Sequence, residues 1–184
     1  MISPRFLLTL SLSILVSCSP MTPSGDGSSN RSSLDSALRT TYPTVSGQQV
    51  SLSDFRNKIV LLHFIASWCA ECAIEAPSLN SVHSSFKDSN FSVVGVAIDD
   101  DPFQMQVFRS KHNLQFPVLL DTTGSLKTFF GVKALPTTIF LGKNGTPIRF
   151  SDPGDGEVSA KIEGGRVWDS PKSVEMIAAL VEGR

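Results

Sequence analysis

Two of the three cysteines, Cys69 and Cys72, are separated by two residues, and this spacing could support a reversible dithiol. Cys69 follows an apolar run of strand length and precedes a segment with helical spacing of apolar residues, so it lies at a predicted helix N-terminus. The N–H groups and dipole of a helix start favour a thiolate, which makes Cys69 the candidate nucleophile. One helical turn away, Cys72 could attack a mixed disulfide on Cys69 and close an internal disulfide.

Other uses of a Cys-x-x-Cys pair fit the sequence less well. A structural zinc ion needs four ligands, but the remaining cysteine, Cys18, is close to the N-terminus and the three histidines are scattered. Haem attachment requires a histidine directly after the second cysteine, where this chain has Ala73. Two cysteines packed as small hydrophobic residues are less suited to a strand-to-helix junction. We therefore predict redox chemistry without a metal or cofactor.

Two further side chains near the pair could handle protons. His63 interrupts an otherwise apolar run, and a buried polar ring needs a partner. Because imidazole titrates near neutrality, His63 could accept the Cys72 proton, or it could be a neutral core histidine. Glu75 shares a helix face with Cys72, so it could modulate thiol ionisation or relay a proton. The alternative for Glu75 is a solvated helix carboxylate.

The elements that must position these residues fit into one domain. The chain has 184 residues, of which 41% are hydrophobic, enough for one domain with an appendage. Its net charge of -1 gives no basic field for nucleic acid, so we expect no nucleic-acid partner. The predicted strands are residues 59–65, 91–98, 116–120, 137–141, 146–150 and a segment between 158 and 165, after a small hairpin around 45–52. The predicted helices are residues 69–87, 102–114, 126–130 and 171–180.

This alternation of strands and helices indicates an α/β fold. Its parallel part would be joined by right-handed crossovers. Asp101 and Pro102 form a typical helix start, and Asn144-Gly145 between apolar runs is a strong signal for a hairpin turn.

The N-terminal residues 1–17 are expected to be cleaved off and not to form part of the folded domain. Residues 1–17 contain one basic residue and a short apolar run, which is typical of a secretory signal peptide. The run ends at Leu15-Val16-Ser17-Cys18 and resembles the lipobox of bacterial lipoproteins, so we predict lipidation of Cys18; an ordinary cleaved signal peptide is the alternative. Residues 18–41 are rich in Ser, Gly and Pro and are predicted to be a flexible tether, which leaves residues 42–184 as the domain.

Two stretches, residues 64–77 around Trp68-Cys69-Ala70-Glu71-Cys72 and residues 131–138 around Leu135-Pro136, resemble the two signature stretches of the thioredoxin superfamily. The chain is most similar to the TlpA/ResA-like branch of membrane-tethered extracytoplasmic thiol-disulfide oxidoreductases, from about Val45 to the C-terminal helix. The resemblance implies a thioredoxin-like fold: a central mixed sheet flanked by helices, an N-terminal hairpin and a central β/α insertion.

The resemblance also implies roles for single residues. Pro136 would be a cis-proline facing the active site, Leu135 would offer backbone groups to a bound partner chain, and Trp68 would shield the disulfide and contribute to docking. Glu75 matches an acidic residue that this branch often carries. His63 departs from the family, because the equivalent position is an aspartate in thioredoxins and often an asparagine in this branch.

The implied activity is reduction of disulfide bonds in oxidised exported proteins such as apocytochrome c. Electrons would come from a membrane thiol transporter, and the lipid on Cys18 would hold the domain at a membrane. The negative charges of Glu71 and Glu75 would weaken thiolate stabilisation and favour the reductant direction.

Two other functions are possible for a thioredoxin-like chain. A thioredoxin-like copper-binding protein could hold Cu(I) between two thiolates, but such proteins space their cysteines by three and add a later histidine, whereas no histidine follows His112. A peroxiredoxin-type peroxidase needs proline and threonine seven and three positions before its cysteine. This chain has Leu62 and Ala66 there.

Overall fold

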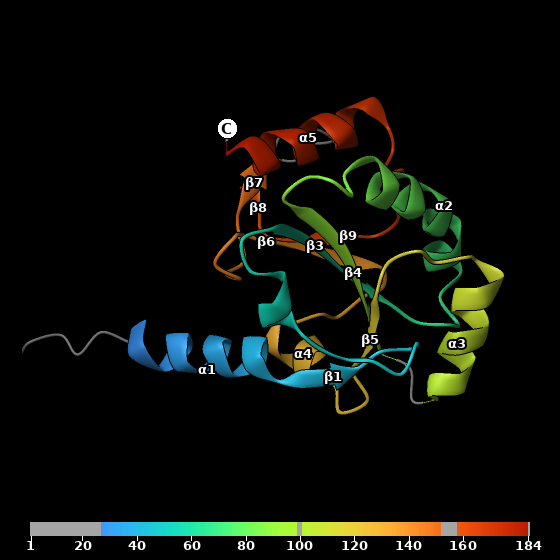
Figure 1. The fold of residues 1–184 in the computed structure, drawn as a ribbon, viewed down its shortest axis with the longest axis horizontal. Coiled ribbons are helices and arrows are strands. Elements are labelled where there is room, and N and C mark those ends of the chain that lie inside the picture. The colour runs from blue at the N-terminus through green and yellow to red at the C-terminus, as the bar shows by residue number, and fades with distance from the viewer. Residues whose placement is uncertain (1–26, 99–100, 152–157, 184) are drawn as a thin grey trace, which may run out of the picture.

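The computed structural model describes residues 27–98, 101–151 and 158–183, and they form a central mixed sheet covered by helices (Figure 1). The sheet has five strands in the order β5-β4-β3-β6-β9. Strands β3, β4 and β5 run parallel, β6 pairs antiparallel with β3, and β9 pairs antiparallel with β6. Their bounds are Ile59–Ile65 (β3), Phe91–Ala97 (β4), Val118–Leu120 (β5), Thr137–Leu141 (β6) and Ile162–Glu163 (β9). The predicted thioredoxin-like α/β fold is confirmed.

Helices cover both faces of the sheet. In Figure 1, α2 and α5 lie on one side of the sheet, and α1 and α4 lie on the other. The helices are α1 (Gly27–Arg39), α2 (Ala70–Ser85), α3 (Pro102–Lys111), α4 (Ser125–Phe129) and α5 (Pro171–Glu182), with a 3-10 turn at Leu52–Phe55. All seven residues of β3 are buried, as expected for a central strand covered on both faces.

Alternation along β3 determines which core each side chain enters. Leu61 and Ile65 belong to the core packed under α2 and α5, whereas Leu62 and Phe64 belong to the core shared with α1 and α4. Because side chains alternate along a strand, His63 projects to the same face as Leu61 and Ile65. The only histidine of β3 therefore points toward the helix that begins at the cysteine pair.

Local signals for two helix starts are confirmed. Cys69 is the N-cap of α2, and its sulfur accepts a hydrogen bond from the Cys72 backbone N–H at 3.2 Å. Asp101 caps α3 by accepting from the Phe103 backbone N–H, and Pro102 occupies the first helical position. In both cases the capping side chain accepts a backbone N–H of the first helical turn, which determines the residue at which the helix begins.

The prediction that residues 18–41 form a flexible tether is wrong for residues 27–39, which form α1. Leu38 of this helix is 2% exposed and packs in the core with Leu34 partly buried beside it. Composition argued against order here, but two leucines four residues apart give the helix an apolar edge that the domain buries. The part of the predicted tether before residue 27, including Cys18, lies outside the described residues, as does the predicted signal peptide.

The region after β6 differs from its predicted strands. An N-terminal hairpin is confirmed, but its first strand lies earlier than predicted: β1 (Thr41–Pro43) pairs antiparallel with β2 (Gln49–Ser51). The predicted turn forms at Lys143-Asn144-Gly145, but the predicted strand at 146–150 is reduced to an isolated bridge from Pro147 to Leu141. The chain then forms a separate short pair, β7 (Phe150–Ser151) with β8 (Val158–Ser159). Pro147 itself needs no N–H at this bridge, because the Gly142 N–H bonds to the Thr146 carbonyl and the Ile148 N–H to the Phe140 carbonyl; the pairing with β6 ends after Ile148.

Among the described residues, no helix is both long and apolar enough to cross a membrane.

Candidate active site

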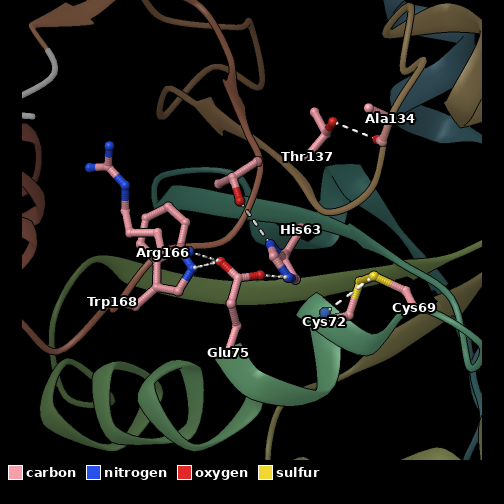
Figure 2. The surroundings of a disulfide bond; sticks show 9 residues. His63, Cys69, Cys72, Glu75, Ala134, Thr137, Arg166 and Trp168 are labelled. Carbon is pink, nitrogen blue, oxygen red and sulfur yellow. Dashed lines mark hydrogen bonds and ion pairs between the residues drawn. A yellow bond between two sulfur atoms is a disulfide. The ribbon is translucent and has the colours of Figure 1, made fainter. Parts of the chain in front are cut away.

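Cys69 and Cys72 form a disulfide bond at the start of α2, with an S–S distance of 2.07 Å and a Cα–Cα distance of 5.3 Å (Figure 2). Cys69 is 7% exposed and Cys72 is 2% exposed. The two sulfur atoms are thus at bonding distance, and Cys69 is the more accessible of the two. This is the arrangement a reversible dithiol requires.

The exposed side of the disulfide is a rim built from two loops. Trp68 is 70% exposed, and the Leu135–Pro136 peptide bond is cis, as the resemblance implied. A cavity of about 640 Å³ is lined by Trp68, Cys69, Glu71 and Leu135, among others. A second cavity, of about 420 Å³, lies across Trp68 and Cys69 and reaches α3. The structure therefore brings Trp68 and Leu135 to the same opening as Cys69, with Pro136 buried behind Leu135.

His63 lies on the buried side and is fully enclosed. Its Nδ1 is 2.8 Å from the Thr138 hydroxyl on the neighbouring strand β6, and its Nε2 is 3.2 Å from Glu75 Oε2 on α2. In the described part of the chain, Nε2 and Oε2 have no aligned hydrogen-bond partner, so their closest polar contact is this ion-pair distance to each other. The predicted polar partner is thus the Thr138 hydroxyl at Nδ1, and a carboxylate oxygen lies within ion-pair distance of Nε2.

Glu75 is 2% exposed, so the alternative of a solvated helix carboxylate is wrong. Its Oε1 accepts two hydrogen bonds, from the Arg166 backbone N–H at 2.7 Å and from the Trp168 indole N–H at 3.0 Å. Its Oε2 faces His63 (Figure 2). The structure thus joins two of the predicted site residues, His63 and Glu75, in one buried polar chain behind the disulfide.

Three members of this polar chain were not predicted from the sequence: Thr138, Arg166 and Trp168. Thr138 is the last residue of the 131–138 stretch, two residues after Pro136, so its closeness to the site could have been inferred. Trp168 lies in a loop between β9 and α5 and shows no local pattern that links it to Glu75. Only the packing of that loop on α2 makes the connection.

The titratable groups around the rim are Glu71 and two lysines in the larger cavity, with Lys111 and His112 in the smaller one. Partial burial and the charge of Lys111 lower the pKa of His112 below its ordinary value. His83, farther along α2, also has a lowered pKa, because of burial and the charge of Lys58. These two histidines are therefore biased toward the neutral form.

Comparison with known proteins identifies relatives with this chemistry. The chain is 30% identical over 103 residues to the thiol-disulfide oxidoreductase ResA of Bacillus thuringiensis subsp. konkukian, and 32% identical over 111 residues to that of Oceanobacillus iheyensis. These alignments cover 56% and 60% of this chain, and 60% and 58% of the relatives. The chain thus spans about three fifths of the length of the curated relatives it matches.

Among solved structures, a secreted Mycobacterium tuberculosis disulfide oxidoreductase homologous to E. coli DsbE superposes with a TM-score of 0.63 at 29% identity. The superposition covers 79% of this chain and 99% of that protein. The sequence also matches the AhpC/TSA family over residues 34–149, a span that contains the cysteine pair, His63, Glu75 and the cis-proline. With its thioredoxin-like fold and these matches, the chain belongs to the AhpC/TSA family.

Proposed function

We propose that this chain is an extracytoplasmic thiol-disulfide oxidoreductase that reduces disulfide bonds in exported proteins. The observation that carries the proposal is the bonded Cys69–Cys72 pair at a helix start, bordered by two cavities that meet at Cys69. A helix start stabilises the thiolate that attack on a disulfide requires. The relatives named thiol-disulfide oxidoreductase support the same chemistry.

The reaction consists of two thiol-disulfide exchanges. In the first, the Cys69 thiolate attacks one sulfur of the client disulfide, and the second client sulfur leaves as a thiolate. In the second, Cys72 loses its proton and attacks the Cys69 sulfur of the mixed disulfide, and the remaining client sulfur leaves. Two electrons pass to the client, which takes up protons on its two sulfur atoms, and the Cys69–Cys72 disulfide remains.

The buried pair His63–Glu75 is proposed to take the proton that Cys72 loses in the second exchange. Cys72 and Glu75 are three residues apart on α2 and thus share a helix face. Figure 2 draws the His63 ring between the Glu75 carboxylate and the disulfide. Transfer of the proton to the pair would leave Cys72 as the thiolate, which is the form that attacks the mixed disulfide.

The rim is proposed to hold the client. Trp68 offers an exposed aromatic surface beside Cys69, and the Leu135–Pro136 segment offers backbone groups at the same opening. Glu71, exposed in the first turn of α2, adds negative charge near the thiolate. Less stabilisation of the reduced form favours a reductant over a strong oxidant. The proposed donor of electrons is a membrane thiol transporter, and the proposed clients include apocytochrome c.

The proposed localisation depends on Cys18. Acylation of Cys18 after removal of residues 1–17 would hold the domain at the extracytoplasmic side of a membrane. We expect Cys18→Ala to move the protein from the membrane fraction to the soluble extracytoplasmic fraction. Intact-mass analysis of the mature wild-type protein tests the same point, and an unmodified N-terminus would contradict it.

The activity is tested with the soluble domain and a disulfide-bonded client protein. We expect the reduced domain to transfer two electrons per cysteine pair to the client. We expect a redox titration to give a reduction potential more negative than that of strongly oxidising exported thiol-disulfide proteins. Peroxide consumption is measured in parallel, since Leu62 and Ala66 are both fully buried apolar residues at the positions where a peroxidase would need proline and threonine. Peroxide turnover without disulfide reduction would overturn the proposal.

A further inference from the structure

The loop between β9 and α5 holds one oxygen of the Glu75 carboxylate. Both donors to Oε1 come from this loop: the Arg166 backbone N–H at 2.7 Å and the Trp168 indole N–H at 3.0 Å. The other oxygen, Oε2, is left to face His63 Nε2 at 3.2 Å. A carboxylate with two donors on one oxygen cannot turn about its own bond without losing them. The loop therefore determines which oxygen His63 meets.

Trp168 is itself held by the helix that carries Glu75. The indole is fully buried, and the Trp168 backbone N–H donates to the Ser78 hydroxyl at 3.1 Å. That hydroxyl in turn donates to the Glu75 carbonyl oxygen at 2.9 Å. The indole ring also packs edge-on against the His63 ring, with centroids 6.4 Å apart. Trp168 is thus fixed relative to both members of the buried pair.

Hydrogen bonds from neutral N–H groups favour a carboxylate over a carboxyl group, and they offset the cost of burying its charge. We propose that Trp168 is a positioning residue, which keeps the Glu75 carboxylate aimed at His63 so that the pair can take the Cys72 proton. This inference rests on the proposed disulfide reduction. It goes beyond that function because the ability of Glu75 and His63 to accept the proton would depend on Trp168, which is 93 residues from Glu75 in the sequence.

Other charged groups lie close enough to affect the same carboxylate. His63 approaches from β3, Glu71 lies one turn before it on α2, and Arg166 and Asp169 come from the loop. Glu71, Glu75, Arg166 and Asp169 line one cavity of about 380 Å³ between α2 and the loop. A change in a pH profile must therefore be assigned to Glu75 by comparison with a variant that lacks its charge.

The test is the pH dependence of mixed-disulfide resolution in Trp168→Phe, which removes the indole N–H and keeps an aromatic ring. We expect resolution at pH 7 to slow roughly tenfold, the size of one hydrogen bond to a charged group. Without the indole donor, Oε1 keeps only the hydrogen bond from the Arg166 backbone, so the pH dependence of resolution changes as well as its rate. A Trp168→Phe profile that superimposes on the wild-type profile would overturn the inference.

Two matched variants separate positioning from packing. Phe140 packs edge-on against the Trp168 indole, with centroids 6.2 Å apart, so Phe140→Leu disturbs the same core without removing a donor. We expect it to lower thermal stability and to leave the midpoint of the rate profile unchanged. In a Glu75→Gln background, we expect Trp168→Phe to cause no further slowing. Equal slowing by Trp168→Phe in both backgrounds would show that Trp168 does not act through Glu75.

A measurement on the wild-type protein covers the case in which Trp168→Phe does not fold. The chain has two tryptophans, so its proton NMR spectrum contains two indole N–H resonances. The resonance that is missing in Trp68→Phe belongs to Trp68, which assigns the other to Trp168. We expect the Trp168 indole resonance to titrate with the same midpoint as the rate profile, and a resonance that stays constant across that midpoint contradicts the inference. If the wild-type protein reduces no disulfide, the proposed function fails, while this resonance and its response to Glu75→Gln still report on the contact.

Discussion

The two tryptophans of the chain lie on opposite sides of the redox pair, and their surroundings differ in kind. Trp68 is 70% exposed beside Cys69, whereas Trp168 is fully buried and donates to Glu75. The rim around Trp68 consists of loops and open cavities, which suits contact with clients of varied shape. The buried side consists of side chains with assigned partners, from Thr138 through His63 and Glu75 to Trp168.

This difference suggests separate tasks: the rim binds the client, and the buried side transfers protons. An exposed side chain on the rim such as Trp68 can change with little effect on the core, because most of its surface faces solvent. In the buried row of polar side chains, replacement of any one residue leaves a buried polar atom of its neighbour without a partner. Variants on the rim are therefore expected to affect client affinity, and variants on the buried side to affect the rate and pH dependence of resolution.

The largest effect is expected at the cysteines, because both the rim and the buried side act through them. Cys69→Ser removes the nucleophile, so we expect no reduction of a disulfide client. Cys72→Ser keeps the nucleophile but cannot resolve the intermediate, so we expect trapped mixed disulfides on Cys69. Mass spectrometry under non-reducing conditions measures both outcomes. Adducts on the Cys69 variant and none on the Cys72 variant would reverse the roles assigned to the two sulfurs.

The next largest effect is expected for His63→Asn on the buried side. We expect resolution at neutral pH to slow roughly a hundredfold, the lower range for loss of a general base. The slowing fades at high pH, where Cys72 ionises without help. Stopped-flow exchange rates from acid to alkaline pH measure it. His112→Gln is the matched control, because it removes an imidazole from the rim cavity and is expected to leave the profile unchanged.

Should the His63→Asn and wild-type profiles coincide while thermal stability falls, His63 is a core residue and not a proton acceptor. Loss of one partner from a buried ion pair costs about 3–5 kcal/mol, so a stability change alone does not identify the role. The pH profile is the measurement that distinguishes the two.

A smaller effect is expected for Trp68→Ala on the rim. We expect KM for a folded client protein to rise severalfold, while the pH profile of resolution keeps its midpoint. Val158→Ala is the control, since Val158 is also an exposed apolar residue, at 57%, but belongs to β8 and lines neither rim cavity. A shifted midpoint in the Trp68 variant would show that rim and buried side are coupled.

The smallest effect concerns His83, a half-buried imidazole that contrasts with the fully enclosed His63. Burial and Lys58 lower the pKa of His83 in the folded protein, so the unfolded chain binds its proton more readily. Its contribution to stability is complete above the ordinary value of about 6.5 and is lost as pH falls through the folded pKa. We expect His83→Gln to reduce the loss of stability between pH 7 and pH 5. Urea unfolding midpoints at the two pH values measure it, and an equal loss in both proteins would contradict it.

The sequence alone determined the elements whose signals are local. The apolar run at Ile59–Ile65 is β3 to the residue, and Asp101-Pro102 starts α3. The Cys-x-x-Cys spacing determined that two sulfurs could bond, since residues three apart on a helix start are neighbours whatever surrounds them. The resemblance to thioredoxins added the cis bond at Pro136, which the residues by themselves do not indicate.

The tertiary structure alone decided what the buried polar residues contact. His63 meets Thr138 75 residues away because β6 pairs antiparallel with β3, and Glu75 meets Trp168 because the loop before α5 packs on α2. Composition also failed for α1, where two leucines find a surface that only the folded domain provides. Periodicity and capping act within a few residues, whereas these contacts depend on strand order and on which loop covers which helix.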